Sequence, residues 1–409
     1  MKPLTVFALT FSSISLLAAE ADWPEFRGRT GQGISSAVQV PVKWGAAENV
    51  AWKVELPGKG WSSPVVSAGK IYVTTAVGES STGATLHALC LDAKTGKLLW
   101  NTEVLKASSG ATSAMHKKNS LASPTPIVTA DRLYVHFGHM GTAALDLAGK
   151  VIWKQTTLGY EINHGGGGSP ALVGGMLVYS CDALSDPYLA AIDAATGAVR
   201  WKTPRDTPAK KKFSFSTPLV VGNQIVSPAS GLVGGYDIKT GKEQWRVTYG
   251  EGYSVVPRPV LAGGKVFVSS SFDKPVVKAI RLDGASGDVS DTHVAWTLGK
   301  GGPHTASMII SGDHIFLVSD GGIATCAEHN TGNVLWTERL PGNYSASPVL
   351  AEGRIYFLNE TGTTTVIRAG ATFETLATNA LDDPTLASPA VVDGAIILRS
   401  EKYLWRIGK

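Results

Sequence analysis

The phrase AIDAATGAVRW, at residues 191–201, returns along the chain and constrains its fold more than any other feature. Full or degraded copies stand at 90–100, 144–153, 235–245 and 326–336. In a full copy an Asp opens a tight turn and accepts backbone N–H groups, a Thr hydroxyl supports it, and a Gly takes the positive φ that closes the loop. A Trp follows four residues after the Gly. The pattern therefore predicts one β-hairpin repeated many times.

A second marker gives the number of repeats. Strands that begin with Ser-Pro or a variant of it recur 40 to 60 residues apart, with the proline position at Pro64, Pro124, Pro170, Pro218, Pro259, Met308, Pro348 and Pro389. In each unit an aromatic strand follows the marker and precedes the hairpin. This spacing is typical of propeller blades. The sequence thus predicts an all-β fold, an eight-bladed β-propeller of four-stranded antiparallel blades.

The two ends of the chain predict how the ring closes. After Pro389 only two further strands follow, at 395–400 and 403–408, whereas a strand without a hairpin partner, 49–56, precedes the first blade. We expect the N-terminal strand to join the last blade, which leaves no open edge. Seven tryptophans are expected to dock against a neighbouring blade: Trp52, Trp100, Trp153, Trp201, Trp245, Trp296 and Trp336.

The first residues predict export. Residues 1–21 combine an early Lys, an apolar stretch and a small-x-small site at Ala19 and Ala21, the pattern of a signal peptide. No later segment approaches the roughly 20 apolar residues that a membrane span needs, and no Cys follows the apolar stretch to carry a lipid anchor. We expect a periplasmic or extracellular monomer with an arm at 22–48, which packs on the propeller, and the propeller itself at 49–409.

Cysteines, histidines and net charge point to no catalytic chemistry. Cys90, Cys181 and Cys326 are expected to be small buried hydrophobic residues without disulfides. His136 and His139, with the loop histidines, raise the alternative of a metal-dependent or hydrolytic enzyme, but a strand running into a turn provides ligand geometry only by chance. We expect no metal and no catalytic residues. The net charge of +4 gives no case for nucleic acid.

The repeat resembles the tryptophan-docking motif of pyrroloquinoline-quinone (PQQ) dehydrogenases and PQQ-like propellers, and residues 191–201 match each of its fixed positions. The stretches 22–33, 56–66 and 386–408 are similar to secreted bacterial PQQ-like repeat proteins. The resemblance implies the fold of the quinoprotein alcohol dehydrogenase-like superfamily. Enzymes of this group bind PQQ over Ca²⁺ or a lanthanide and many stack a vicinal Cys pair on it, which this chain lacks. Outer-membrane barrel-assembly lipoproteins share the fold and present loops to partners.

Two functions follow from the resemblance. We expect a non-catalytic binding or scaffold propeller without cofactor, and keep a PQQ-dependent dehydrogenase with PQQ and Ca²⁺ as the alternative. Loops from an outer strand to the next inner strand converge on one mouth of the channel and gather basic and aromatic residues, which suit a protein or an anionic glycan. The predicted ligand contacts are Trp61, Asn119, His164, Lys212, Tyr253, Arg258, His304 and Tyr344.

Overall fold

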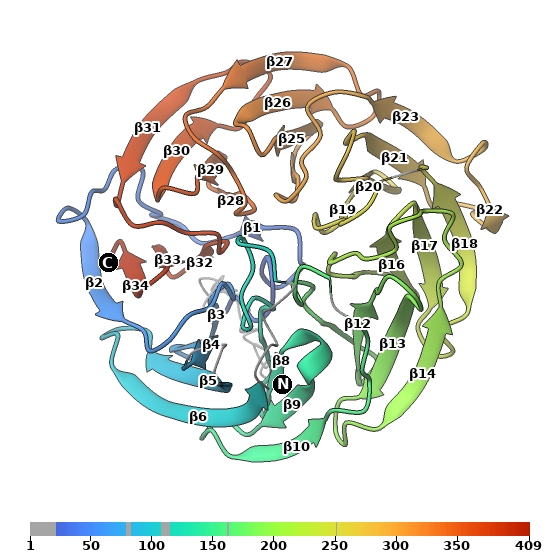
Figure 1. The fold of residues 1–409 in the computed structure, drawn as a ribbon. Coiled ribbons are helices and arrows are strands. Elements are labelled where there is room, and N and C mark those ends of the chain that lie inside the picture. The colour runs from blue at the N-terminus through green and yellow to red at the C-terminus, as the bar shows by residue number, and fades with distance from the viewer. Residues whose placement is uncertain (1–21, 79–82, 108–114, 162, 251) are drawn as a thin grey trace, which may run out of the picture.

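The computed structural model describes residues 22–78, 83–107, 115–161, 163–250 and 252–409. Eight twisted sheets stand around a central axis, as Figure 1 shows, and in each sheet the strands run from the axis outward in a four-stranded antiparallel order. The predicted eight-bladed, all-β propeller is confirmed. The one helical element of the described part is a single 3₁₀ turn, η1 (Gly138–Met140).

The blades are numbered 1 to 8 from the first marker strand. The innermost strands are β3 (Val65–Ser67), β7 (Ile127–Val128), β11 (Ala171–Val173), β15 (Leu219–Val221), β19 (Val260–Ala262), β24 (Ile309–Ser311), β28 (Val349–Ala351) and β32 (Ala390–Val392). The second strands are β4 (Lys70–Val77), β8 (Leu133–His136), β12 (Met176–Cys181), β16 (Gln224–Ala229), β20 (Lys265–Ser269), β25 (His314–Val318), β29 (Arg354–Leu358) and β33 (Ala395–Arg399).

The third and outer strands complete each blade. The third strands are β5 (Ala84–Asp92), β9 (Thr142–Leu145), β13 (Tyr188–Asp193), β17 (Leu232–Asp237), β21 (Val277–Arg281), β26 (Ile323–Glu328), β30 (Thr363–Arg368) and β34 (Tyr403–Ile407). The outer strands are β6 (Leu98–Ala107), β10 (Val151–Gln155), β14 (Val199–Pro204), β18 (Glu243–Thr248), β23 (Val294–Leu298), β27 (Val334–Arg339), β31 (Thr375–Ala380) and β2 (Val50–Glu55). Two short strands, β1 (Ile34–Ser35) and β22 (Gly287–Asp288), pair in parallel with β28 and β18.

Ring closure follows the prediction. The N-terminal strand β2 is the outer strand of blade 8 and pairs antiparallel with β34, with Lys53 opposite Trp405. A buried Arg399 at the end of β33 then ties blade 8 to blade 1, because its guanidinium donates to the Ser62 hydroxyl at 2.7 Å and to the Thr74 carbonyl at 2.6 Å. The first and last strands of the propeller therefore share one sheet, and no blade is left with an unpaired third strand.

The repeated hairpin has the expected local chemistry. In the copy at 191–201, Asp193 Oδ1 accepts the backbone N–H groups of Ala195 and Thr196 and the Thr196 hydroxyl, while Gly197 has a φ of 76°. A Cβ on Gly197 would lie 2.7 Å from the Trp153 ring of the preceding blade, so the glycine also makes room for that indole. The hairpin thus encodes both its own turn and its contact with the neighbouring blade.

Most of the predicted docking tryptophans bridge adjacent blades. Six donate their indole N–H to a backbone carbonyl in the next hairpin: Trp52, Trp100, Trp153, Trp201, Trp296 and Trp336. Trp245 differs, because its indole donates to Gln224 of its own blade at 2.6 Å. The next hairpin is longer there, and its strand β22 pairs alongside Trp245 instead.

The buried core between blades follows the strand period of two: Ala88 and Cys90 of β5 face one neighbouring blade, and Leu89 and Leu91 face the other. All three cysteines are buried and unpaired, as expected.

The Ser-Pro markers form a hydrogen-bonded circle around the axis. In seven blades a Ser or Thr hydroxyl at the position before the proline (or Met308) accepts a backbone N–H from its counterpart in the preceding blade, for example Ser169 Oγ from Thr125 at 2.9 Å and Thr125 Oγ1 from Ser63 at 3.2 Å. The circle is open at blade 5, where Arg258 takes this position and its side chain only donates. Blade 2 corrects one sequence assignment, since β7 begins after Pro126 rather than Pro124. We call the circle of these residues the inner belt: Ser63, Thr125, Ser169, Thr217, Arg258, Ser307, Ser347 and Ser388.

The arm at 22–48 lies against the innermost strands. Its residues pair with blade 1 through Trp23 and Val66, and β1 adds to the inner edge of blade 7. Trp23 is fully buried, and in Figure 1 the arm passes close to the centre of the ring, where β1 is labelled. The arm therefore covers one end of the channel. No helix among the described residues has the length and apolar character that a membrane crossing requires.

Candidate binding site at the channel mouth

A cavity of about 340 Å³ lies in the channel at the end away from the arm. All eight connections from an outer strand to the next innermost strand contribute to its wall, through Trp61, His116, His164, Phe215, Tyr253, Thr305, Ser345 and Leu386 among others. Phe26 of the arm lines it from the other side. We call the rim formed by these connections the mouth. A volume of this size is at the lower end for small-molecule sites.

An arc of aromatic rings runs around the mouth from blade 2 to blade 6. Successive rings contact each other edge-on, tilted or stacked, with centroid separations of 5.6 Å, 5.1 Å, 5.6 Å, 6.1 Å and 4.8 Å, in the order His116, His164, Phe213, Tyr253, Phe272 and His304. Such contacts favour a fixed arrangement of the rings. Since Tyr253 and Phe272 are only half-buried, the arc presents ring surface to the cavity.

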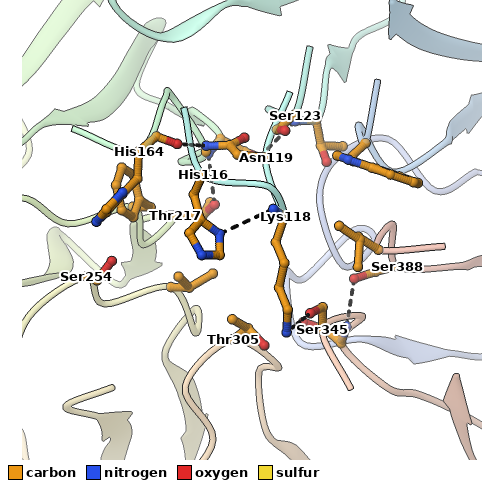
Figure 2. A pocket seen from close by; sticks show the side chains of 18 of the residues that line it. His116, Lys118, Asn119, Ser123, His164, Thr217, Ser254, Thr305, Ser345 and Ser388 are labelled. Atoms are coloured by element: carbon orange, nitrogen blue, oxygen red, sulfur yellow. Dashed lines mark hydrogen bonds between the residues drawn. The ribbon is translucent and has the colours of Figure 1, made fainter. Parts of the chain in front are cut away.

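Backbone contacts hold the first part of the arc. The His164 carbonyl accepts the Asn119 side-chain amide at 2.8 Å and the His116 N–H at 3.2 Å, which joins the loops before blades 2 and 3. His164 itself has a φ of 70°, a conformation that a residue with a Cβ rarely adopts. The following Gly165 leaves no room for a side chain, because a Cβ would lie 2.9 Å from the Asn119 amide nitrogen. Figure 2 shows His116, Asn119 and His164 gathered at one side of the cavity.

From the same loop as His116 and Asn119, Lys118 reaches across the mouth to two carboxylates. Its ammonium lies 2.6 Å from Glu360 Oε1 and 3.9 Å from Asp320 Oδ2. It also lies 3.4 Å from the Ser345 hydroxyl, as Figure 2 shows. Asp320 Oδ1 also accepts the backbone N–H groups of His304 and Thr305 at 3.0 and 3.1 Å. The carboxylates are thus held by donors from adjacent connections, and the lysine is the long side chain that comes to them.

The mouth offers little free positive charge. Among the described residues that line the cavity, Lys118 is the one Lys or Arg, and it is paired with Glu360. Burial, and then the neighbouring His116 and Lys211, lower the pKa of His164, so its imidazole is neutral at pH 7. The Lys211 ammonium lies over the Tyr253 ring, 4.1 Å from its centroid. The cation count of the loops therefore overstates the positive potential inside the cavity.

The structure brings half of the predicted contacts together. Trp61, Asn119, His164 and Tyr253 line the cavity. His304 stacks on Phe272 at the rim without lining the cavity, and Lys212 is half-buried outside the lining. Tyr344 is fully buried, and its hydroxyl donates to the Pro341 carbonyl at 3.1 Å. Cavity residues absent from the prediction include His116, Lys118, Phe215 and Phe272.

Arg258 lies at the covered end and holds the arm. It occupies the inner-belt position of blade 5, is 2% exposed, and donates to the Phe26 carbonyl at 2.6 Å and the Pro218 carbonyl at 3.2 Å. Glu25 lies 3.4 Å from the guanidinium; burial raises the pKa of this carboxyl, and Arg258 opposes the rise. Gly31 crosses directly over the guanidinium. The prediction that places the Arg258 side chain at the mouth is therefore wrong.

Of the histidine pair in blade 2, His136 is buried in the interior and His139 is half-buried. His136 is 2% exposed, lies 2.8 Å from the Thr142 hydroxyl through Nδ1, and packs against Tyr179. Burial, and then His139, lower the pKa of His136 to about 3, which keeps it neutral. Within the described ranges, no group of three or more His, Cys, Asp or Glu side chains is arranged to hold a metal ion.

Known proteins with similar sequences and structures place the chain in a family. A curated relative, outer membrane protein assembly factor BamB of Yersinia pestis, is 24% identical over 295 residues, which cover 66% of this chain and 68% of that protein. The crystal structure of BamB from Moraxella catarrhalis superposes with a TM-score of 0.63 at 12% identity, over 88% of this chain and 97% of that one. A europium-containing methanol dehydrogenase superposes with a TM-score of 0.69 at 10% identity, over 92% and 89%.

These two structural likenesses show the fold alone, because both identities are low. The sequence profile of one family matches residues 42–163, 149–288 and 287–372, which is well over half of the chain. The chain therefore belongs to the PQQ-like propeller family whose profile is described as outer membrane protein assembly factor BamB.

Proposed function

We propose that this protein is a non-catalytic scaffold of the bacterial cell envelope that binds a protein partner at the mouth. The family supports a role in outer-membrane protein assembly, which the name of the Yersinia relative states for that protein. The predicted signal peptide supports a periplasmic place of action. The observation that carries the proposal is the asymmetry of the channel, in which the arm covers one end and the aromatic arc occupies the other.

The aromatic arc has the composition of a protein-binding surface. Aromatic side chains are enriched where proteins meet, because they bury a large area at a low cost in conformational entropy. Tyr253 and Phe272 stand at the centre of the arc and are half-buried in the free protein. The carboxylates of Asp320 and Glu360 on the facing loops add a polar rim. A partner loop that inserts an apolar side chain between these two sides fits this surface.

The donor set at the mouth does not fit PQQ over Ca²⁺. Calcium takes six to eight oxygen ligands, several of them carboxylates. The two carboxylates that Lys118 contacts, Asp320 and Glu360, are committed to its ammonium and to backbone or hydroxyl donors. The cysteines are buried in separate blades, so no vicinal pair can stack on a quinone. We therefore propose that the protein works without PQQ. Incubation with PQQ and Ca²⁺ or a lanthanide should give neither bound quinone absorbance nor dye-coupled alcohol oxidation, and stoichiometric binding with turnover would refute this.

Site-specific photo-crosslinking tests the position of the partner surface. A photoreactive phenylalanine analogue replaces Phe272 at the mouth in one variant and Leu99 on the outer strand of blade 1 in the other. Leu99 is the matched control, because it is also apolar and is 44% exposed. We expect crosslinks to a discrete envelope protein from position 272 and none from position 99. Crosslinks from position 99 alone would move the partner to the outer edge of the ring.

A further inference from the structure

The inner belt carries hydroxyl groups that face the cavity with unused hydrogen-bonding capacity. Six belt residues line the cavity: Ser347, whose hydroxyl donates to Ser307 Oγ at 3.1 Å, and five others. Each of these five accepts one backbone N–H, at 3.1, 3.2, 2.9, 3.1 and 2.8 Å, in the order Ser63, Thr125, Ser169, Thr217 and Ser388. Within the described ranges, none of these five hydroxyls donates its hydrogen to a protein acceptor. Figure 2 shows Thr217 and Ser388 at the wall of the cavity.

The chemistry of a hydroxyl defines what these five groups can bind. A Ser or Thr side chain has one O–H to donate and two lone pairs to accept. The N–H of the neighbouring blade uses one lone pair, so each residue retains one donor and one acceptor. A ligand that also carries paired donors and acceptors on neighbouring atoms matches such a ring. Sugar hydroxyls have this property, whereas a carboxylate accepts only and leaves the acceptor side of the belt unmatched.

Aromatic walls stand above the belt in the same cavity. Trp61 lines it from the connection before blade 1, the neighbouring rings of Tyr253 and Phe272 line it beside blade 5, and Phe26 closes it on the arm side. The apolar face of a pyranose ring packs against an aromatic face, while its equatorial hydroxyls point outward to polar partners. The cavity thus combines ring faces with a circle of small hydroxyls within about 340 Å³. A purely apolar ligand would leave the belt hydroxyls without partners, which is costly in a closed site.

The charges at the mouth select against an acidic ligand. Lys118, the one Lys or Arg on the described part of the cavity wall, is held by Glu360, and Asp320 lies 3.9 Å from the same ammonium. An incoming carboxylate or sulfate would approach two carboxylates that share a single lysine, and it would exchange water for neutral donors. An uncharged ligand carries neither cost. The expectation of an anionic glycan from the loop sequences is therefore revised for the cavity itself.

We propose that this cavity binds an uncharged saccharide, with one pyranose ring against the aromatic walls and its hydroxyls on the inner belt. The site shares Tyr253 and Phe272 with the partner surface of the rim, but the inner-belt hydroxyls belong to the cavity alone, and sugar binding is tested without any protein partner. The ligand is either a free neutral oligosaccharide or the neutral non-reducing end of a longer glycan, since both present the same ring. Binding of short oligosaccharides separates the first case from the second, in which only a polymer-linked end binds.

Calorimetric titration of the full mature chain tests the proposal. The probes are neutral gluco-, galacto- and manno-oligosaccharides, the corresponding neutral polysaccharides, and uronic-acid oligosaccharides of equal length. We expect at least one neutral probe to bind and the acidic ones to bind more weakly. The absence of any neutral binding at concentrations on the order of 10 mM, a very weak affinity limit, would overturn the proposal. Tighter binding of the uronic-acid series would overturn it as well.

Variants locate the bound sugar. Tyr253→Ala removes a wall and should weaken binding about 2- to 12-fold, the factor that corresponds to one aromatic contact. Thr217→Val removes one belt hydroxyl at constant shape and should weaken it by a similar factor. Lys212→Ala is the control outside the cavity and should leave affinity unchanged. If Thr217→Val does not fold, Tyr253→Ala carries the test. Wild-type affinity in the folded cavity variants would place the sugar elsewhere and refute the site, while crosslinking at position 272 reports separately on the partner.

Discussion

Each end of the channel contains a cation that bridges distant parts of the chain, Arg258 at the covered end and Lys118 at the mouth. Arg258 joins the inner belt of blade 5 to the arm, more than 200 positions away in sequence, and its side chain is 2% exposed. Lys118 joins the loop before blade 2 to Glu360 of blade 7, and its side chain is 30% exposed. Both make short charge-assisted contacts. The two contacts differ in burial: the Arg258 contact is closed to solvent, whereas solvent and ligands can reach the Lys118 contact. We call the buried contact of Arg258 with the arm the clamp.

This difference has an energetic reason. A guanidinium removed from water needs every donor satisfied, and its loss leaves buried carbonyls without partners. A half-exposed ammonium exchanges its carboxylate for water at little cost. The covered end is therefore expected to fix the fold, whereas the mouth is free to rearrange around a ligand. Substitutions at the two ends test this difference, and their expected effects on the free energy of unfolding decrease from the covered end to the mouth.

Removal of Arg258 should have the largest effect. Arg258→Ala leaves the carbonyls of Phe26 and Pro218 buried without donors and Glu25 without its cation. We expect the free energy of unfolding to fall by about 3–5 kcal/mol, as for other broken buried pairs. Urea denaturation measures it, with Lys212→Ala as the control, which should stay within about 0.5 kcal/mol of the wild type. Equal losses in the two variants would contradict a clamp at the covered end.

A substitution at Gly31 approaches the same clamp from the arm. Gly31 has a φ of 67°, and a Cβ there would lie 2.4 Å from the Arg258 guanidinium carbon. Gly31→Ala should cost about 2–4 kcal/mol, because the left-handed backbone and the overpacking act together. Gly284→Ala is the matched control: its φ is 71°, but no atom lies within 4 Å of the added carbon. Its loss, measured by the same denaturation curve, should be limited to about 1–2 kcal/mol.

The same contrast explains what could be predicted from the sequence. The hairpins and the closure by β2 were accessible, since Asp193, Thr196 and Gly197 encode their turn locally and the strand count leaves one gap. The sequence also predicts which residues stand in loops at the mouth, but it does not predict in which direction a side chain of these loops points. Arg258 takes a belt position and turns toward the arm, which no local pattern reports.

The missed cavity residues have a similar origin. Phe272 lies between the second and third strands of blade 5, β20 and β21, a connection that also ends at the mouth. The prediction used only connections from outer to innermost strands. Lys118 stands beside the predicted Asn119, and its role depends on Glu360, 242 positions away. Only the closed ring brings these two together.

Two histidines extend the contrast to pH. His136 is buried with its pKa lowered to about 3, whereas an unfolded His titrates near 6.5. The unfolded chain therefore takes up a proton that the folded chain excludes, so stability is full above pH 6.5 and falls by about 1.4 kcal/mol for each pH unit below it, or about 2 kcal/mol by pH 5. His136→Gln should remove this slope from the melting curves. His116→Gln, the same change at an exposed histidine, is the matched control for the substitution itself.

The smallest change is expected at Lys118. Lys118→Met removes the cation but keeps the aliphatic stem, and the carboxylates of Asp320 and Glu360 retain their backbone and Ser345 donors. Exposed and half-exposed ion pairs contribute about 0–1 kcal/mol, so the unfolding free energy should fall by no more than that. The loss should also shrink in about 0.5 M salt, where the screening length is only a few ångströms. Denaturation at low and high salt measures both quantities. A loss of unfolding free energy as large and as independent of salt as that of Arg258→Ala would mean that the mouth is as rigid as the covered end. A ligand would then have to fit the cavity without any rearrangement of its rim.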